Sequence, residues 1–261
     1  MDSVNKTLYI PLYGKSYVSR KGIILADPKA EQIWAAEAFP LKGKSASKWL
    51  AYYMGIRSAV FDDWVRQQLV STDDTIVLHL GCGLDSRVLR IGADSLPWYD
   101  VDFPTVIQER RRYYTESDTY HMVAGDLRDN NWLQTIPQAA RAVVIMEGVS
   151  MYLSPAARRA LLRALGSHFQ QIQLLTDCYT ELAAKLSRYR NPINDVGVTT
   201  VYGIHCPDEL ENDSLTFIKE WDMTPAHYIA QLPSAERRIF QTLYAGRMSN
   251  KLYRLYEYQS K

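Results

Sequence analysis

The stretch TIVLHLGCGLDSRVLRI, residues 75–91, decides the fold of this 261-residue chain. Its first six residues, TIVLHL, are mostly aliphatic or β-branched, which is typical of a strand buried on both faces. The turn Gly81-Cys82-Gly83 follows at once, and its two glycines permit a tight turn whose backbone can approach a ligand closely. The helical pattern of DSRVLRI comes next. The stretch therefore predicts the strand, turn and helix that open an α/β fold.

Further strands and helices alternate after this stretch. Strand-like runs lie at 96–102, 122–124, 141–148, 171–177, 214–223 and 251–259. Helical spacing is found at 29–70 (broken by a turn-like segment, 40–47), 85–93, 105–117 and 154–169, the last with Ser154 as its predicted N-cap. Strands that alternate with helices predict a mostly parallel sheet with helices on both faces. A ligand of such a sheet binds beyond the carboxyl ends of the strands.

The composition excludes several function classes. The 30 Lys and Arg residues balance 29 Asp and Glu residues, whereas a nucleic-acid-binding protein has a basic excess. No apolar run reaches the roughly 18 residues that cross a bilayer, and the N-terminus lacks the pattern of a secretory signal. Cys82, Cys178 and Cys206 have no paired spacing, which fits reduced thiols better than disulfides or a zinc site. We expect a cytoplasmic enzyme that binds no metal, nucleic acid or membrane.

Acidic residues at the ends of the predicted strands are the candidate ligand contacts. The second strand ends in Asp100-Val101-Asp102, and an acid at this place can bind both hydroxyls of an adenosine ribose. Because alternate side chains of a strand face opposite sides, only one aspartate can reach the ligand. Asp102, at the very end of the strand, is favoured. Asp100 is then solvated or faces a helix. The third glycine of a dinucleotide fingerprint is missing, since Ser86 stands in its place.

Two later strands also end in acids. Gly125-Asp126-Leu127 follows the short run 122–124, and Asp126 could contact an adenine amino group beside the apolar Leu127. An ordinary helix cap for the segment leading to Trp132 explains Asp126 equally well. Glu147 follows five apolar residues, where a carboxylate is costly to bury unless it is paired or functional.

The sequence contains no catalytic triad, metal-ligand cluster or phosphate-binding loop motif. Its five histidines are scattered, and His79, inside the first strand, is expected to be a satisfied core residue rather than a base. We therefore expect a reaction that needs neither a strong nucleophile nor a metal from the protein.

Together, these motifs resemble the leucine carboxyl methyltransferase family, including its bacterial branch of polyketide-type O-methyltransferases. The most specific motifs are GCGLDSR (81–87), where the family commonly has G-x-G-L-D-T-R, then VDFP (101–104) and EGVSMYL (147–153). The resemblance covers most of the chain, with further matching stretches at 7–30, 54–69, 98–114, 124–133, 146–155 and 169–177.

The resemblance implies a class I methyltransferase fold of the Rossmann-like type. Its mostly parallel sheet has seven strands, with N-terminal helices and a lid insertion added. The implied cofactor is S-adenosylmethionine, and the product is S-adenosylhomocysteine. One domain over 1–261 is expected, with a helical cap (1–70), a cofactor-binding core (71–177), a lid and substrate insertion (178–213) and C-terminal strands and helix (214–261).

The resemblance also assigns roles to residues. Arg57 would hold the methionine carboxylate, and Lys15 would reach the cofactor at a position where the family often has Arg. Asp85 and Arg87 would either pin the loop or contact the ligand. The cofactor-binding residues so implied are Lys15, Arg57, Gly81 (methionine portion), Gly83, Asp102 (ribose), Asp126 and Leu127 (adenine) and Glu147 (amino group).

The expected reaction is methyl transfer to an oxygen of a small, polyketide-like acceptor. A carboxylate acceptor is already ionised at neutral pH and needs no base. A hydroxyl acceptor would need one, and Tyr202 and His205 are the candidates. Substrate-binding candidates in the segment 178–210 are Tyr179, Arg188, Tyr202 and His205. The enzyme is expected to be a monomer or homodimer.

Three other functions remain open at this point. Within the same family, the acceptor could be a protein C-terminal carboxylate, although the compact length favours a small acceptor. A nicotinamide-dependent oxidoreductase would use the same glycine turn and strand-end acid, but the missing third glycine speaks against it. A protein that binds the cofactor without turnover is the third alternative.

Overall fold

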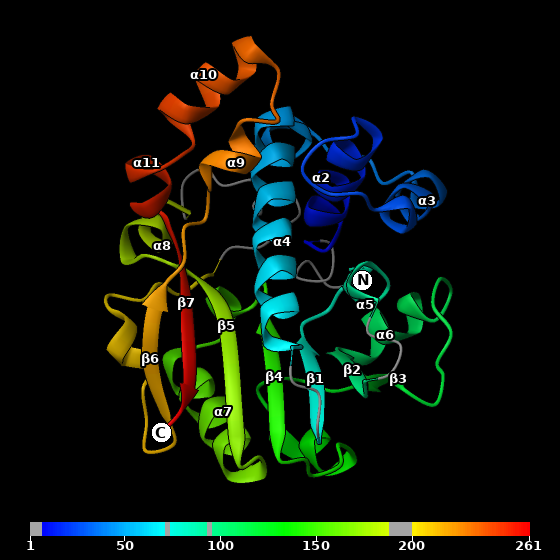
Figure 1. The fold of residues 1–261 in the computed structure, drawn as a ribbon, viewed down its shortest axis with the longest axis vertical. Coiled ribbons are helices and arrows are strands. Elements are labelled where there is room, and N and C mark those ends of the chain that lie inside the picture. The colour runs from blue at the N-terminus through cyan, green and yellow to red at the C-terminus, as the bar shows by residue number, and fades with distance from the viewer. Residues whose placement is uncertain (1–6, 71–73, 93–95, 188–199) are drawn as a thin grey trace.

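The computed structural model describes residues 7–70, 74–92, 96–187 and 200–261. They include one seven-stranded sheet of order β3-β2-β1-β4-β5-β7-β6 (Figure 1). The strands are β1 Thr75–Leu80, β2 Trp98–Asp102, β3 Tyr120–Ala124, β4 Arg141–Met146, β5 Gln171–Tyr179, β6 Leu215–Glu220 and β7 Tyr253–Ser260. Strands β1 to β5 pair in parallel, whereas β7 runs antiparallel to both of its neighbours, β5 and β6. The mostly parallel sheet and its seven strands confirm the prediction.

Helices cover both faces of this sheet. In Figure 1, α4 (Lys48–Gln68) crosses the face toward the viewer and α7 (Pro155–His168) lies behind. Alternate residues of the central strands pack on the two sides. Val77 and Val143 belong to the apolar cluster that includes α4, and Leu78 and Val144 to the cluster that includes α7. Burial on both faces explains why these strands are continuous apolar runs.

The N-terminal helices lie beyond the carboxyl ends of the strands (Figure 1). They are α2 (Tyr9–Arg20) and α3 (Pro28–Glu37), followed by a 3₁₀ turn, η1 (Gly43–Ala46). The remaining helices are α5 (Arg87–Ile91), α6 (Pro104–Arg110), α8 (Glu181–Ser187), α9 (Ala226–Ile229), α10 (Ser234–Leu243), α11 (Arg247–Asn250) and the 3₁₀ turns η2 (Asn130–Thr135), η3 (Ser150–Tyr152) and η5 (Pro207–Leu210).

Two local predictions can be compared directly. Ser154 caps α7 as expected, since its side chain accepts a hydrogen bond from the Ala157 amide. The helix expected over 105–117 is shorter and ends at Arg110. Arg111 to Tyr113 continue as a tighter turn, with i to i−3 hydrogen bonds from the amides of Arg112 and Tyr113. Residues 113–115, two tyrosines and a threonine, favour helix only weakly.

The sequence analysis also made predictions about membrane segments, metal sites and cysteines. In the part that the structure describes, no helix is long and apolar enough to cross a membrane, and no group of His, Cys, Asp and Glu side chains could hold a metal ion. Cys82 and Cys178 are buried free thiols, and Cys206 is a partly buried one.

The turn after β1 depends on Gly81, and we predict that Gly81→Ala will destabilise the fold. Gly81 has a φ of 68°, and an added Cβ would lie 2.2 Å from Val149 Cγ2. Left-handed backbone strain and overpacking together should lower the free energy of unfolding by about 2–4 kcal/mol, measured by denaturant titration.

Gly83→Ala is the matched control. Gly83 also has a positive φ, 52°, but an added Cβ would meet only Leu8 Cβ, at 3.4 Å. Only the backbone strain remains, so a loss of about 1–2 kcal/mol is expected. Equal losses in the two variants would show that the contact with Val149 has no importance.

Candidate functional site

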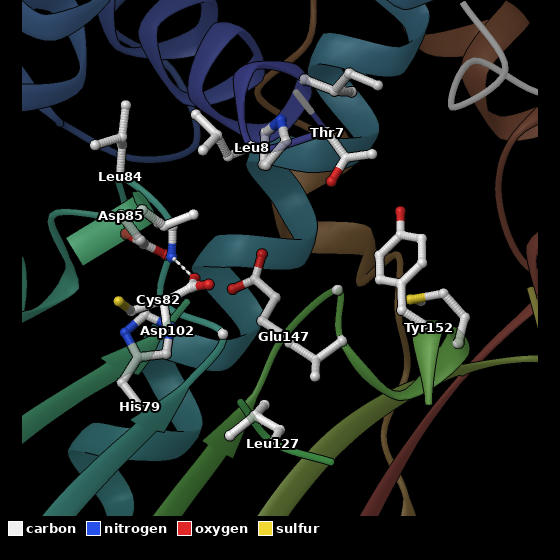
Figure 2. A pocket seen from close by; sticks show the side chains of 18 of the residues that line it. Thr7, Leu8, His79, Cys82, Leu84, Asp85, Asp102, Leu127, Glu147 and Tyr152 are labelled. Atoms are coloured by element: carbon white, nitrogen blue, oxygen red, sulfur yellow. Dashed lines mark hydrogen bonds between the residues drawn. The ribbon is translucent and has the colours of Figure 1, made fainter. Parts of the chain in front are cut away.

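A cavity of about 240 Å³ lies at the carboxyl ends of the strands. Its walls come from the turns after β1 to β4, from helices α2 and α4, and from two tyrosines on β5 and β7. Figure 2 shows the carboxylates of Asp102 and Glu147 on one side of this cavity, with Thr7 and Leu8 across from them and Tyr152 to one side. The cavity thus lies where a parallel sheet binds its ligands.

All eight predicted cofactor-binding residues line this one cavity. They are Lys15, Arg57, Gly81, Gly83, Asp102, Asp126, Leu127 and Glu147. Their positions are now given by the structure, whereas their contacts with a cofactor stay predictions.

The two aspartates of β2 face opposite sides, as their spacing requires. Asp102 points into the cavity, and the amides of Gly83 and Phe103 donate to its carboxylate at 2.8 and 2.7 Å. Burial raises the pKa of Asp102, although these amides oppose the shift. The carboxylate is therefore held in one orientation at the edge of the glycine turn.

Asp100 faces a helix, one of the two places expected for it. It is fully buried and pairs with Arg110 of α6, and it also accepts hydrogen bonds from the side chains of Trp98 and Tyr120. His79 lies 3.3 Å from its carboxylate and is buried too. Arg110 also donates to the carbonyl of Gly83 at 3.0 Å, which ties this cluster to the glycine turn.

Asp126 forms a bidentate ion pair with Arg128 at the rim of the cavity, with distances of 2.9 and 2.6 Å. This pairing lowers the pKa of Asp126. The 3₁₀ turn that leads to Trp132 is capped by Asp129 rather than by Asp126. Leu127 is buried beside it and lines the cavity.

Arg57 and Glu147 form the centre of the site. Arg57 Nε donates to Glu147 at 3.0 Å, and its Nη1 donates to Asp177 at 3.0 Å and to the Tyr253 hydroxyl at 2.9 Å. No described residue accepts a hydrogen bond from Nη2 of Arg57. Since Arg57 lines the cavity, Nη2 retains two donors for a ligand anion.

A buried charge network extends from this centre. The second oxygen of Glu147 accepts from Arg87, whose Nε pairs with Asp62 at 2.7 Å. Lys15 of α2 pairs with Asp85 of the glycine turn at 3.0 Å, and burial lowers the pKa of Lys15. The ion pairs of Asp85 and Arg87 fit a role in pinning the loop. Because Asp85 also lines the cavity, a contact between Asp85 and a ligand stays a prediction.

The other end of the cavity is apolar and rich in tyrosine. Its lining includes Leu50, Met54, Tyr152, Tyr179 and Tyr253. The rings of Tyr179 and Tyr253 meet edge to face with centroids 4.9 Å apart. The sequence reasoning named Tyr179 but missed Tyr152, which lies in the EGVSMYL motif, and Tyr253, which lies in the alternating last strand.

Two of the remaining candidates, Tyr202 and His205, do not belong to the described lining of the cavity. Tyr202 is tied through its amide to the carbonyl of Met151, and His205 is exposed, with its Nδ1 3.8 Å from Glu181. The geometry gives no support to either as a base. Arg188 lies outside the described residues.

The fold and site together define a class I, S-adenosylmethionine-dependent methyltransferase. Solved structures agree on the fold. Magnesium protoporphyrin IX methyltransferase from Synechocystis superposes with a TM-score of 0.53 and 12% identity, over 90% of this chain and 93% of that one. Geranyl diphosphate C-methyltransferase from Streptomyces coelicolor gives a TM-score of 0.50 and 15% identity, over 87% of each chain.

The chain belongs to the leucine carboxyl methyltransferase family, whose model matches residues 12–166. It is 29% identical over 242 residues to the tetracenomycin polyketide synthesis O-methyltransferase TcmP of Streptomyces glaucescens, covering 91% of this chain and 89% of that protein. It is 26% identical to the S-adenosyl-L-methionine-dependent methyltransferase dpfgK of Gibberella zeae, over 64% of this chain and 61% of that one. The enzyme class and cofactor implied by the resemblance are thereby confirmed.

We predict that Asp102→Ala will weaken S-adenosylmethionine binding about ten- to hundredfold. Hydrogen bonds to a charged acceptor contribute about 1.5–3 kcal/mol each, and a tenfold change in affinity corresponds to about 1.4 kcal/mol. Calorimetric titration measures the affinity, and thermal unfolding should show that the variant stays folded.

Asp100→Ala, two residues away, is expected to lower the stability of the protein without lowering its affinity for the cofactor. It leaves Arg110 buried without its partner, and breaking such a pair costs about 3–5 kcal/mol of stability. Cofactor affinity of the folded protein should change little. A loss of affinity in Asp100→Ala but not in Asp102→Ala would reverse the assignment of the two residues.

Proposed function

We propose that this enzyme transfers the methyl group of S-adenosylmethionine to an oxygen of a small, aromatic, polyketide-like acceptor. One observation carries the proposal: a single cavity joins the strand-end acids and Arg57 to an apolar, tyrosine-lined end. Tyrosine rings suit the packing of a flat acceptor beside a cationic sulfur. The relationship to an enzyme of polyketide synthesis supports the same class of acceptor.

The residues present fit the cofactor. Asp102, held by two backbone amides, would accept hydrogen bonds from the ribose hydroxyls. Asp126 and Leu127 would bind the adenine. Arg57, through Nη2, and Lys15 would hold the methionine carboxylate, and Glu147 would hold the amino group. When bound, S-adenosylmethionine supplies an activated methyl group on a sulfonium.

The chain itself has to align the acceptor and exclude water. Helix α2 and the residues after β4 both line the cavity, so a bound acceptor would displace water between them. A carboxylate acceptor requires no proton removal. A hydroxyl acceptor would need a base, and His79 is the histidine in the described lining of the cavity. Because His79 is buried beside Asp100, we favour a carboxylate acceptor over a hydroxyl acceptor.

The test begins with calorimetric titrations of S-adenosylmethionine, S-adenosylhomocysteine and NAD. The first two should bind and NAD should not. Binding of NAD alone would overturn the proposal in favour of an oxidoreductase. A panel of aromatic acids and phenols is then incubated with methyl-labelled S-adenosylmethionine. Base-labile product identifies a methyl ester and base-stable product an ether. Transfer only to a peptide C-terminus would replace the small acceptor by a protein.

We predict that Arg57→Lys will weaken binding of S-adenosylmethionine about tenfold while binding of adenosine changes little. Lysine keeps the charge but loses the planar donors that Arg57 divides between its partners and the ligand carboxylate. Adenosine has no such carboxylate. Competitive calorimetry with both ligands measures the difference.

Arg66→Lys is the matched control. Arg66 lies on the same helix but is half-exposed, and Asp63 is its ion-pair partner among the described residues. It should alter neither affinity. Equal losses for both ligands in Arg57→Lys would mean that Arg57 is structural. The cytoplasmic location and the monomeric or homodimeric state stay predictions of the sequence.

A further inference from the structure

Asp177 is a buried carboxylate to which the proposed contacts give no role. It lies near the carboxyl end of β5, has no exposed surface and is not part of the cavity lining. One oxygen accepts from Arg57 Nη1 at 3.0 Å and the other from the Gly148 amide at 2.7 Å. The Tyr253 hydroxyl also donates to it. Asp177 thus does not line the cavity itself but contacts Arg57, which does.

The charges in this part of the molecule do not balance. The ion pairs around the cavity connect four basic side chains, Lys15, Arg57, Arg87 and Arg90, to five acidic ones, Asp27, Asp62, Asp85, Glu147 and Asp177. When all are ionised, the network carries one surplus negative charge. Taking a charge out of water without a full partner is unfavourable, so a ligand that brings a positive charge is stabilised here.

The surplus charge belongs to Asp177. Its cationic partner, Arg57, is shared with Glu147. Arginines lower the pKa of Asp62, Asp85 and Glu147 in spite of burial. Burial and the charge of Glu147 instead raise the pKa of Asp177. Asp27 and Asp177 each pair with only one of these cations, Arg90 and Arg57. Asp27 also caps helix α3 through the Ala30 amide, which leaves Asp177 as the member of the group whose charge is least compensated.

The cofactor and its product differ by one positive charge. S-adenosylmethionine carries a carboxylate, an ammonium and a sulfonium, whereas S-adenosylhomocysteine has a neutral thioether in place of the sulfonium. We propose that the negative charge of Asp177 raises the affinity of this enzyme for S-adenosylmethionine relative to its affinity for S-adenosylhomocysteine. The proposal rests on the placement of the methionine portion beside Arg57 and Glu147, and not on the identity of the acceptor.

Asp177 would then act at two stages of turnover. Before transfer, its charge attracts the cationic cofactor through the low-dielectric wall. After transfer, the same charge again lacks compensation, so the site favours exchange of the neutral product. The hydrogen bonds that other carboxylates would make to the ribose or the amino group are common to both ligands, so the two ligands are distinguished by the through-space effect of charge.

The decisive experiment compares both ligands in the full-length enzyme and in Asp177→Asn. We expect the affinity for S-adenosylmethionine to fall on the order of tenfold, the effect of one charge several ångströms away in a partly buried site. The affinity for S-adenosylhomocysteine should change little. A structural loss would instead weaken both ligands alike, and an unchanged affinity ratio would overturn the proposal.

Two variants serve as controls. Asp177→Glu keeps the charge and should retain the preference. Tyr253→Phe removes a hydrogen bond to Asp177 without changing charge, so the ratio of the two affinities should persist. If the wild-type enzyme binds neither ligand, the proposed function fails together with this inference. If the wild-type enzyme binds both ligands but Asp177→Asn leaves the ratio of their affinities unchanged, the proposed function stands and this inference alone fails.

The pH dependence of the wild-type enzyme gives a second test should Asp177→Asn not fold. The titratable groups that face Asp177 are Arg57 and Tyr53 of α4, Glu147 after β4, Tyr152 of η3, Cys178 of β5 and Tyr253 of β7. Burial raises the pKa values of Tyr53 and Tyr152. The pKa values of Arg57 and Tyr253 are raised, that of Cys178 is raised to about 12, and that of Glu147 is lowered. Mild acid therefore protonates Asp177 before these groups. The ratio of the affinities for S-adenosylmethionine and S-adenosylhomocysteine should fall as the pH is lowered from neutral. A ratio that stays constant down to the lowest pH at which the enzyme remains folded would overturn the proposal.

Discussion

The guanidinium of Arg57 is the contact on which the rest of the site depends. It joins helix α4 to Glu147 after β4, to Asp177 on β5 and to Tyr253 on β7. Each of these groups would be costly to bury alone, and each is satisfied by the others. The interaction holds the ends of three strands at fixed distances from one helix. A cavity with a constant shape follows from this arrangement.

The sheet supplies the second constraint, which is topological. The parallel strands β1 to β4 deliver the glycine turn, Asp102, Asp126 and Glu147 to one edge. Helix α2 then closes this edge, because Lys15 pairs with Asp85 in the glycine turn. The sheet and the segments that follow its strands thus supply both the acids for the cofactor and the tyrosines of the acceptor end, to which α4 adds Leu50 and Met54.

The sequence predicted the sheet well because its strands are apolar runs whose length and endings are local signals. The end of β2 also allowed a choice between Asp100 and Asp102. Arg57 could not be found in this way, since its pattern on the helix resembles that of a surface charge; the family resemblance was needed. Asp177 and Tyr253 acquire their importance only through tertiary pairing between β5 and β7, which leaves no trace in local spacing.

The position of β7 has a consequence for biosynthesis. This strand follows β5 and β6 in the sequence, yet it lies between them in the sheet. Chains emerge from the ribosome with their N-terminal parts first. When β5 and β6 emerge, the strand that separates them has not yet been made, and Arg57 lacks Tyr253 as a partner. The cavity is therefore completed only after β7 has been synthesised and has inserted between the two earlier strands.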